Sequence, residues 1–457
     1  MAENPVPTTS TFKNGPVRVT ATKKTSCQLV NGYTALHWAV ENDDRDAVQL
    51  LLEAGADVNR VASFDAHAGV TPLHLAAQDG RTDVANDLLR HGATRDPRKS
   101  TRNRDNITPL HQAVYNSHPA TVDALLAAGC DPNIQADNGY AAIHYAAQKG
   151  SVEMTKAIAN TSACDVALRA STREQRDITP LHLAVQSGSV DVVLALAAAG
   201  APVDAGKRMD GGVSGVTALH QAVYQEREEI AAALLELGAD PLRSMDGWYT
   251  SLHVAAAKGC ARIARRLVEA TSERAVDTRA SLGDQTDLTP LHVAAQHGHD
   301  EVIRVFVDAG ADTSAVRGFG DRGAITALHL AAENGFVDAV VALLETTTPD
   351  GGDRSSLINA QDSLGFTALH LAVQYQFPDV VRVLVVAGID VSLRTNDGLT
   401  AWRIACQQND TSIMQTLGPE PPASALRTDE AISNSLYYKE RKSNRLRSLL
   451  CGINKHV

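Results

Sequence analysis

The sequence predicts an all-α solenoid of about eleven helix–turn–helix repeats with hairpin finger loops. Three observations carry this prediction. One eight-residue phrase recurs eleven times, successive copies start 33 to 41 residues apart, and 44% of the 457 residues are hydrophobic although only 19 are aromatic (3 Trp, 9 Tyr and 7 Phe). A period of about 20–50 residues is the signature of repeat architectures, in which each layer stacks on its neighbours. A core built from Ala, Val and Leu suits thin, close-packed helical layers.

The recurring phrase opens the first helix of each predicted repeat. Two full copies are VTPLHLAA at 70–77 and ITPLHLAV at 178–185. The threonine is placed to cap a helix, because its hydroxyl can accept a hydrogen bond from a free amide of the first turn. Proline follows it where a missing N–H and a fixed φ cost nothing. The threonine, or the residue in its place, stands at positions 34, 71, 108, 141, 179, 217, 250, 289, 326, 367 and 400.

The rest of each predicted repeat follows the same order. Leu73, Ala76 and Ala77 fall on one helical face, where the small alanines allow a helix partner to approach closely. A glycine in the left-handed conformation often stops this helix. A second helix with apolar periodicity follows, for example at 83–93, and a polar loop of hairpin character leads to the next threonine. The stopping glycines are Gly80, Gly150, Gly188, Gly259, Gly298 and Gly335.

These residues and their spacing resemble the ankyrin repeat family. The resemblance rests on T-P/A-L-H-x-A followed by LLxxGAD, as at 51–57, and it covers about 31–417. It implies an ankyrin-repeat solenoid of L-shaped units that recognises proteins through its finger tips and inner helices. It also implies that the repeated histidine hydrogen-bonds to the threonine and to neighbouring backbone. Trp402 and Arg403 replace Leu and His in the last copy, which fits a polar end cap.

Composition divides the chain into three predicted parts. Residues 1–30 are expected to form a disordered segment and cap, 31–417 the repeat array, and 418–457 a linker and basic tail. The stretch 437–457 has a net charge of +5, whereas the whole chain carries −11 and is not expected to bind nucleic acid as a whole. Six cysteines without pairing rhythm, and no signal peptide or membrane-spanning apolar run, indicate a cytoplasmic protein. We expect it to be a monomer.

A longer period of three repeats is superimposed on the first. Residues 71–178 parallel residues 179–288, with HQAVY at 111–115 and again at 220–224. The residue before the threonine is also aromatic in every third copy. We infer that a three-repeat block was duplicated. The aromatic residues of this series are Tyr33, Tyr140, Tyr249 and Phe366.

No pattern in the sequence predicts catalysis or a cofactor. His297 and His299 resemble a His-x-His ligand pair, but no third and fourth ligands are suggested. The segment 318–323 matches G-x-G-x-x-G, yet it lies in a finger loop and not after a strand of a βαβ unit. We therefore predict a non-enzymatic protein without metal, cofactor or small-molecule substrate. The ten histidines of the phrase, about one per layer and too far apart to share an ion, are His37, His74, His111, His144, His182, His220, His253, His292, His329 and His370.

The predicted partner-binding surface consists of finger tips and the two residues that follow each alanine pair. Tyrosine supplies rigid amphipathic area of the kind found in binding hot spots, although these residues can equally be solvated helix ends. Several fingers are basic: residues 94–107 carry a local charge of +3, and Lys207 and Arg208 follow further on. Basic tips on an acidic body suit acidic partner segments, or they serve only solubility. The predicted binding residues are Tyr115, Tyr224, Tyr375, Arg98, Arg102, Arg104, Lys149 and Trp248.

Two functions therefore remain open from the sequence. The first is a non-catalytic scaffold or adaptor that binds one or more proteins along its inner groove and finger loops. The second is a regulatory inhibitor or tethering subunit whose basic tail contacts membrane lipid or nucleic acid, with Cys451 as a candidate for acylation. A plain basic tail without a membrane role is the alternative for this segment, because one weak amphipathic turn gives little membrane affinity.

Overall fold

The computed structural model describes residues 11–12, 15–16 and 33–419, apart from 65–66, 102–103, 173–174, 210–211, 246–248, 272–274, 283–284, 320–321 and 346–353. Most of the predicted N-terminal segment and nearly all of the predicted tail thus lie outside the described residues. The described residues form 23 α-helices and 12 strands. They belong to two compact units, Met1–Pro202 and Val203–Val457. Five copies of the phrase fall in the first unit and six in the second, which matches the predicted repeat number.

The first unit consists of five helix pairs. The first helix of each pair is called inner and the second outer. The inner helices are α1 (Ala35–Glu41), α3 (Pro72–Gln78), α5 (Pro109–Tyr115), α7 (Ala142–Gln148) and α9 (Pro180–Ser187). The outer helices are α2 (Arg45–Glu53), α4 (Thr82–Arg90), α6 (Pro119–Ala127), α8 (Val152–Ala159) and α10 (Val190–Ala198).

The second unit adds six pairs built in the same way. Its inner helices are α11 (Ala218–Tyr224), α13 (Ser251–Lys258), α15 (Pro290–His297), α17 (Ala327–Asn334), α20 (Ala368–Gln374) and α22 (Ala401–Gln407). Its outer helices are α12 (Glu228–Glu236), α14 (Ala261–Glu269), α16 (Asp300–Asp308), α18 (Val337–Glu345), α21 (Pro378–Val386) and α23 (Thr411–Leu417). A short helix α19 (Arg354–Ile358) and a 3₁₀ turn at Ala275–Asp277 lie in its connections.

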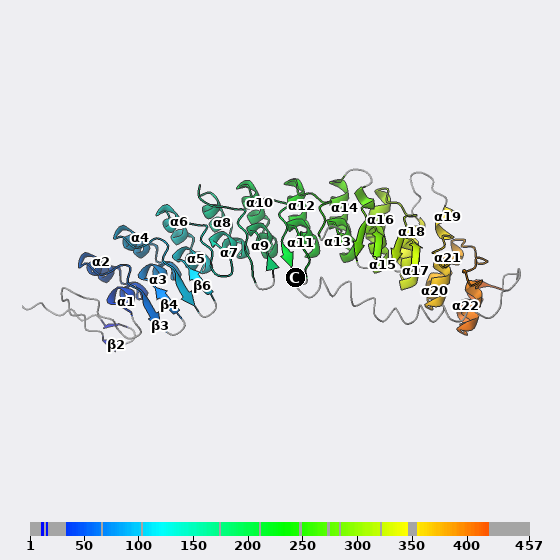
Figure 1. The fold of residues 1–457 in the computed structure, drawn as a ribbon, viewed down its shortest axis with the longest axis horizontal. Coiled ribbons are helices and arrows are strands. Elements are labelled where there is room, and N and C mark those ends of the chain that lie inside the picture. Colours follow the sequence, from blue (N-terminus) through cyan, green and yellow to red (C-terminus); the bar gives the residue numbers. More distant parts are fainter. Residues whose placement is uncertain are drawn as a thin grey trace, which may run out of the picture. The chain divides into compact units, whose positions relative to one another are not determined.

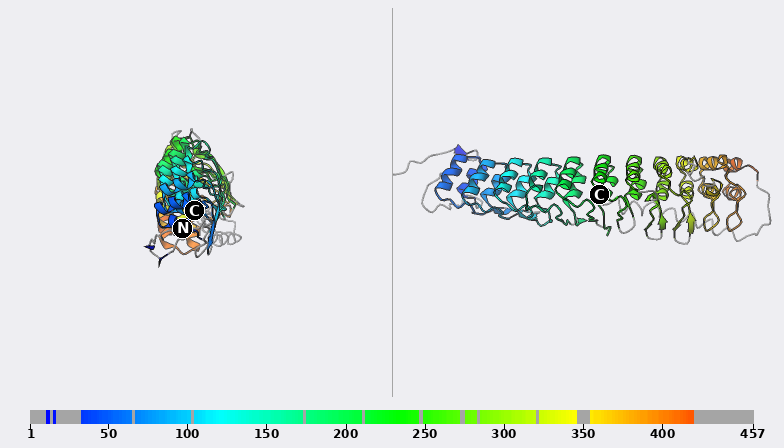
Figure 2. Two further views of the ribbon diagram at one scale, coloured as in Figure 1. Left: turned by 90° about the vertical axis from the view of Figure 1, so that its left-hand side faces the viewer. Right: turned by 90° about the horizontal axis from the view of Figure 1, so that it is seen from above.

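Within each unit the inner helices form one layer and the outer helices a second layer. Figure 1 shows the two rows, with the finger strands continuing beyond the inner row, and the right-hand view of Figure 2 shows the helices of each unit side by side. Each inner helix packs on the next inner helix of its unit, and each outer helix on the next outer helix. The phrase leucines and alanines, such as Leu73 and Ala76, are buried between these layers, as the helical pattern predicts.

Threonine and histidine cap the inner helices reciprocally. The hydroxyl of Thr71 accepts a hydrogen bond from the backbone N–H of His74 (3.4 Å), and Nδ1 of His74 accepts one from the backbone N–H of Thr71 (3.2 Å). Histidine thus takes the place that glutamate has in the usual capping box. In the fourth repeat Ala141 stands in place of threonine, so only the contact between its N–H and His144 remains (3.2 Å).

The finger loops contain the strands, and their length decides whether neighbouring fingers pair. After the long connections, two successive hairpins join into one antiparallel sheet, because extended backbone edges lie side by side. The first unit has the order β3–β4–β5–β6 and the second the order β12–β11–β10–β9. These strands are β3 (Ala62–Phe64), β4 (His67–Val70), β5 (Lys99–Thr101), β6 (Arg104–Ile107), β9 (Ala280–Leu282), β10 (Gln285–Leu288), β11 (Arg317–Phe319) and β12 (Arg322–Ile325). The remaining short strands are β1 (Thr11–Phe12), β2 (Gly15–Pro16), β7 (Gln175–Arg176) and β8 (Arg208–Met209).

The residue that ends the turn after each inner helix adopts a left-handed conformation, as predicted from the stopping glycines. Gly298 has φ +76°, and a Cβ added to it would lie 2.6 Å from the ring of Phe336 in the next repeat. Gly80 and the ring of His118 have the same relation, with 2.4 Å to Nδ1. Other repeats place a side chain in this strained position, among them Ser117 and Glu226. Left-handed backbone and ring packing therefore coincide where glycine is present.

Candidate interaction surface

The repeated histidines are buried in the core, where the fold uses their ring nitrogens. Nε2 of His74 lies 3.0 Å from the carbonyl oxygen of Ile107, the residue before the next threonine. Because Nδ1 accepts the threonine N–H, the proton must sit on Nε2, which donates to this carbonyl. The predicted structural role is confirmed by these contacts. The Nε2 contact to the next repeat recurs at His37, His74, His111, His144, His253, His292, His329 and His370.

Burial also keeps these imidazoles neutral. Desolvation lowers the pKa of His74 to about 3, with the nearby charge of Lys99 adding to the effect. It lowers the pKa of His253 to about 4. With Nδ1 already accepting a backbone hydrogen bond, the unprotonated nitrogen has no lone pair left to offer a metal ion.

The other two candidate chemical motifs are also parts of the repeat framework. Nε2 of His299 lies 3.2 Å from the carbonyl oxygen of Ala257 and donates to it, which links two repeats. No group of three or more His, Cys, Asp and Glu side chains within the described residues is arranged to hold a metal ion. The segment 318–323 belongs to the hairpin of β11 and β12, in which Arg317 pairs with Ile325. A dinucleotide fingerprint needs a strand that turns directly into a helix, and an antiparallel hairpin does not provide this.

Tyr115 and Lys149 meet at the ends of adjacent inner helices in the first unit. Tyr115 is the last residue of α5, and Lys149 directly follows α7. The Lys149 ammonium lies over the Tyr115 ring, 5.2 Å from its centroid, within cation–π range. Tyr115 is 48% exposed, and Lys149 is also exposed. The two predicted binding residues therefore form one solvent-facing pair.

Buried aromatic side chains hold Tyr115 in place from behind. Its ring makes an edge-to-face contact with Tyr145 of α7, at 6.1 Å between centroids. Tyr145 in turn contacts the ring of Tyr140 at 5.3 Å, and its hydroxyl lies 3.1 Å from Nδ2 of Asn138 in the preceding finger. Such packing orients the exposed ring before any partner arrives, which reduces the entropy lost on binding.

The second unit repeats this pair at the equivalent positions. Tyr224 ends α11 and Lys258 ends α13, each 109 residues after its counterpart. The Lys258 ammonium lies 4.5 Å from the centroid of the Tyr224 ring. Here the ammonium also faces Glu226, with 3.7 Å between Nζ and Oε1. Lys258 was not among the predicted binding residues, although the common offset of 109 residues would have indicated it.

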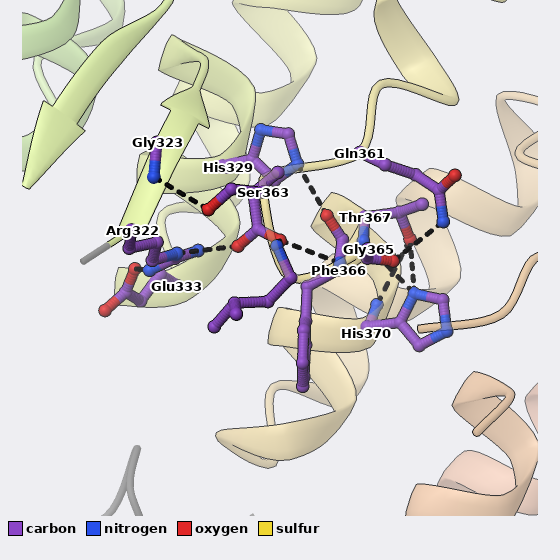
Figure 3. Close-up of polar contacts among 12 residues, drawn as sticks. Arg322, Gly323, His329, Glu333, Gln361, Ser363, Gly365, Phe366, Thr367 and His370 are labelled. Atoms are coloured by element: carbon purple, nitrogen blue, oxygen red, sulfur yellow. Dashed lines mark hydrogen bonds and ion pairs between the residues drawn. The ribbon is translucent and has the colours of Figure 1, made fainter. Parts of the chain in front are cut away.

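A third copy of the pair would fall on Glu333 and Tyr375, but a buried ion network occupies this place. Nη1 of Arg322 lies 2.8 Å from Oε2 of Glu333, and its Nε lies 2.6 Å from Oδ2 of Asp362. Figure 3 shows Arg322 reaching from its strand toward Glu333, with Ser363 and Gly323 linking the two fingers alongside. The Asp362 side chain is 0% exposed, and its Oδ1 accepts the backbone N–H groups of Leu364 and Phe366. Glu333 is thus part of the core and not of the exposed surface.

Comparison with protein families identifies the repeats. A family model described as "Ankyrin repeats (3 copies)" matches residues 61–136, 110–207, 170–245, 243–317 and 317–395, and one described as "Ankyrin repeat" matches 31–63. These matches cover most of the chain. The chain belongs to the ankyrin repeat family. Ankyrin repeats are in general protein–protein interaction modules, and no enzyme family is indicated.

The ankyrin array is also similar to a solved structure. The crystal structure of the ankyrin repeat domain of Bcl-3, described as a unique member of the IkappaB protein family, matches with 27% sequence identity and a TM-score of 0.43. The match covers 52% of this chain and 98% of that domain. No curated protein sequence matches the chain.

The other predicted binding residues of the ankyrin array have different environments. Arg98 is exposed in the finger before β5, and Tyr375 is half-buried directly after α20. Arg104 belongs to β6, while Arg102 and Trp248 lie outside the described residues. The structure therefore brings together Tyr115 and Lys149, and it leaves the other predicted residues apart from that pair.

Two finger lysines that we expected at the exposed tips are instead buried. Lys99 in β5 is 4% exposed and Lys207 is 6% exposed, so the prediction that these charges face a partner is wrong. Nζ of Lys207 donates to Oε1 of Gln221 in the adjacent inner helix, at 2.7 Å. Desolvation lowers the pKa of each lysine to about 8. Both occupy the finger position whose partner is the residue before the threonine, where other repeats have a buried alanine such as Ala62.

Proposed function

We propose that this ankyrin repeat protein is a non-catalytic scaffold or adaptor that binds partner proteins through inner-helix ends and finger loops. The observation that carries the proposal is the exposed Tyr115 ring, which buried aromatic side chains hold against Lys149. Rigid tyrosine rings are enriched among residues that dominate binding energy. Membership of a family of interaction modules supports the same conclusion. Exposed basic residues such as Arg98 suit partners with acidic segments.

Proximity labelling in the native cell tests this proposal with three forms of the full chain. The forms are the wild type, the double variant Tyr115→Ala with Tyr224→Ala, and a control in which exposed outer-helix residues Leu50 and Leu194 become alanine. We expect a set of proteins labelled by the wild type and the control to lose most of its labelling in the tyrosine variant. Equal labelling by all three forms would contradict the proposed surface.

The basic tail motivates a second candidate function, a regulatory or tethering subunit. Residues 437–457 carry a net charge of +5, which would favour anionic lipid or nucleic acid. A chain that ends at residue 419 should then lose binding to phosphatidylserine vesicles or to nucleic acid. Binding that is the same with and without residues 420–457 would remove this candidate.

We further propose a cytoplasmic, monomeric protein. The four cysteines within the described residues, Cys130, Cys164, Cys260 and Cys406, are free thiols, which suits a reducing compartment. No helix in the described part of the chain has the length and apolar character needed to cross a membrane. Cell fractionation and light scattering on the purified chain test location and mass.

A further inference from the structure

We propose that the chain carries two equivalent docking points for one short peptide motif, a carboxylate beside a bulky apolar side chain. The first docking point is Tyr115 with Lys149 in the first unit, and the second is Tyr224 with Lys258 in the second unit. The proposal rests on the proposed interaction function and names the chemistry of the partner. Each docking point acts within its own unit.

The equivalence of the two points is geometric as well as sequential. In both, a tyrosine ends one inner helix and a lysine from the end of the next inner helix places its ammonium over the ring, at 5.2 and 4.5 Å. The tyrosines follow the same HQAV sequence, and both residues recur after 109 positions. Two sites with the same groups in the same arrangement should recognise the same ligand.

The charge at the first point selects the carboxylate. No ion pair joins Lys149 to an acidic side chain among the described residues. The ring of Tyr115 attracts the ammonium but does not neutralise it, so a carboxylate from a partner can still pair with it. The exposed part of the ring offers apolar area next to this charge. A motif with an acidic residue adjacent to Phe, Tyr, Trp or Leu satisfies both groups at once.

The second point differs from the first by one residue, which predicts a difference in affinity. Glu226 faces Lys258 at 3.7 Å, whereas the equivalent residue of the first point is Ser117. Both residues have left-handed backbone, with φ of 58° and 63°, so exchanging one for the other changes charge with little change in strain. Glu226 competes with a partner carboxylate for the ammonium. The first docking point should therefore bind the motif more tightly than the second.

The number of docking points follows from the third equivalent position. Glu333 stands where Tyr115 and Tyr224 stand in the other blocks, and Arg322 holds it in the core at 2.8 Å. A partner carboxylate finds neither a free ammonium nor an exposed ring there, as the close-up in Figure 3 shows for Arg322 and Glu333. We therefore expect two motifs per chain.

Peptide selection followed by calorimetry tests the proposal on the full chain. A random twelve-residue peptide-display library is selected on the wild type, and the enriched peptides are synthesised and titrated. We expect enriched peptides with Asp or Glu next to an aromatic or leucine residue, and a stoichiometry of two per chain with unequal affinities. Enriched peptides that lack acidic residues, or a stoichiometry of one for acidic peptides, would overturn the proposal.

Single-site variants then assign the two binding events. Lys149→Gln should weaken the tighter event about tenfold, and Lys258→Gln should weaken the other by a similar factor. Glu226→Ser should tighten the weaker event until the two affinities agree within about threefold. The matched controls are Lys156→Gln on α8 and Arg265→Gln on α14, which remove exposed charges from outer helices. Thermal melts of every variant establish that the fold is retained.

The outcomes separate this inference from the proposed function. If peptides bind but the lysine variants and Glu226→Ser leave both affinities unchanged, the docking points are refuted while the interaction function stands. If neither displayed peptides nor proteins in the native cell depend on Tyr115 and Tyr224, the proposed function itself fails.

Discussion

At the scale of the residue, the same polar group has different roles according to the partner that stacking gives it. The histidine of each phrase caps its own helix through Nδ1 and reaches the next repeat through Nε2, as His74 does with Thr71 and Ile107. Arg322 shows the more costly case, since a buried ion pair is stable only when every charge and hydrogen-bond donor has a partner. Each role predicts the result of a particular substitution.

Restoring the missing hydroxyl should stabilise the fourth repeat. Ala141 has the extended backbone of the threonine caps, with φ −91° and ψ 172°, but offers no acceptor to the first turn of α7. We expect Ala141→Thr to raise the free energy of unfolding of the first unit by about 1 kcal/mol. Urea denaturation of the full chain measures this change, with Thr108→Ala as the opposite control. A loss of stability in Ala141→Thr would mean that the added methyl group clashes with its neighbours.

Removing one member of the ion network should be severe. Asp362→Ala leaves the Arg322 guanidinium with one carboxylate instead of two and leaves the N–H groups of Leu364 and Phe366 without their acceptor. We expect a loss of about 3–5 kcal/mol in the second unit. Asp379→Ala is the control, because Asp379 forms an exposed pair with Arg382. Equal effects of the two substitutions would contradict the importance of burial.

At the scale of the element, the turn after each inner helix decides how closely repeats stack. Glycine in this turn lets an aromatic ring of the next repeat lie directly on the backbone, as Phe336 does on Gly298. Side chains occupy the turn where the following neighbour is small, as with Ser117 before Ser151 and Gln376 before Asp410. The identity of one turn residue is therefore coupled to a residue in the next repeat.

This coupling predicts opposite effects of two exchanges in the same kind of turn. Gly298→Ala should cost about 2–3 kcal/mol, because the Cβ would lie 2.6 Å from the Phe336 ring and alanine disfavours φ of +76°. Gln376→Gly should gain about 1 kcal/mol, because Gln376 is exposed and has φ of 61°. Denaturation of the two variants provides the measurement. If both variants lose similar stability, relief of backbone strain does not govern the stability effect at residue 376.

At the scale of the whole molecule, the buried histidines link stability to pH. Unfolded histidine binds a proton below pH 6.5, whereas burial lowers the pKa of His74 and His292 to about 3 and that of His144, His253 and His370 to about 4. The unfolded state therefore binds more protons between these limits. Their contribution to stability is complete above pH 6.5 and is lost as pH falls toward the folded pKa values.

The resulting pH dependence is measurable in a window where carboxylates contribute little. We expect the free energy of unfolding to fall between pH 6.5 and 5.5, with a limiting slope of about 1.4 kcal/mol per pH unit for each buried histidine. Urea denaturation at several pH values, with proton uptake on unfolding measured at pH 5.5, checks this. An uptake of less than about one proton per chain would contradict the assignment of neutral buried imidazoles.

The candidate site was accessible from the sequence only in part. Tyr115, Tyr224 and Lys149 were predicted because they follow the alanine pair in the repeat pattern. Their pairing was not, since the ring and ammonium come from repeats about 34 residues apart and meet only when helices stack. Lys99 and Lys207 were assigned to exposed tips because a basic loop looks the same in sequence whether its side chains turn inward or outward.

The sequence by itself determined the repeat, its helix caps and its family, because each rests on local patterns that recur eleven times and reinforce one another. The tertiary structure decided which side chains of those repeats face solvent. It paired Tyr115 with Lys149, buried Lys207 beside Gln221 and closed the third equivalent position with Arg322. Exposure of a side chain depends on the neighbour that the next layer supplies, and that neighbour is set by stacking between repeats.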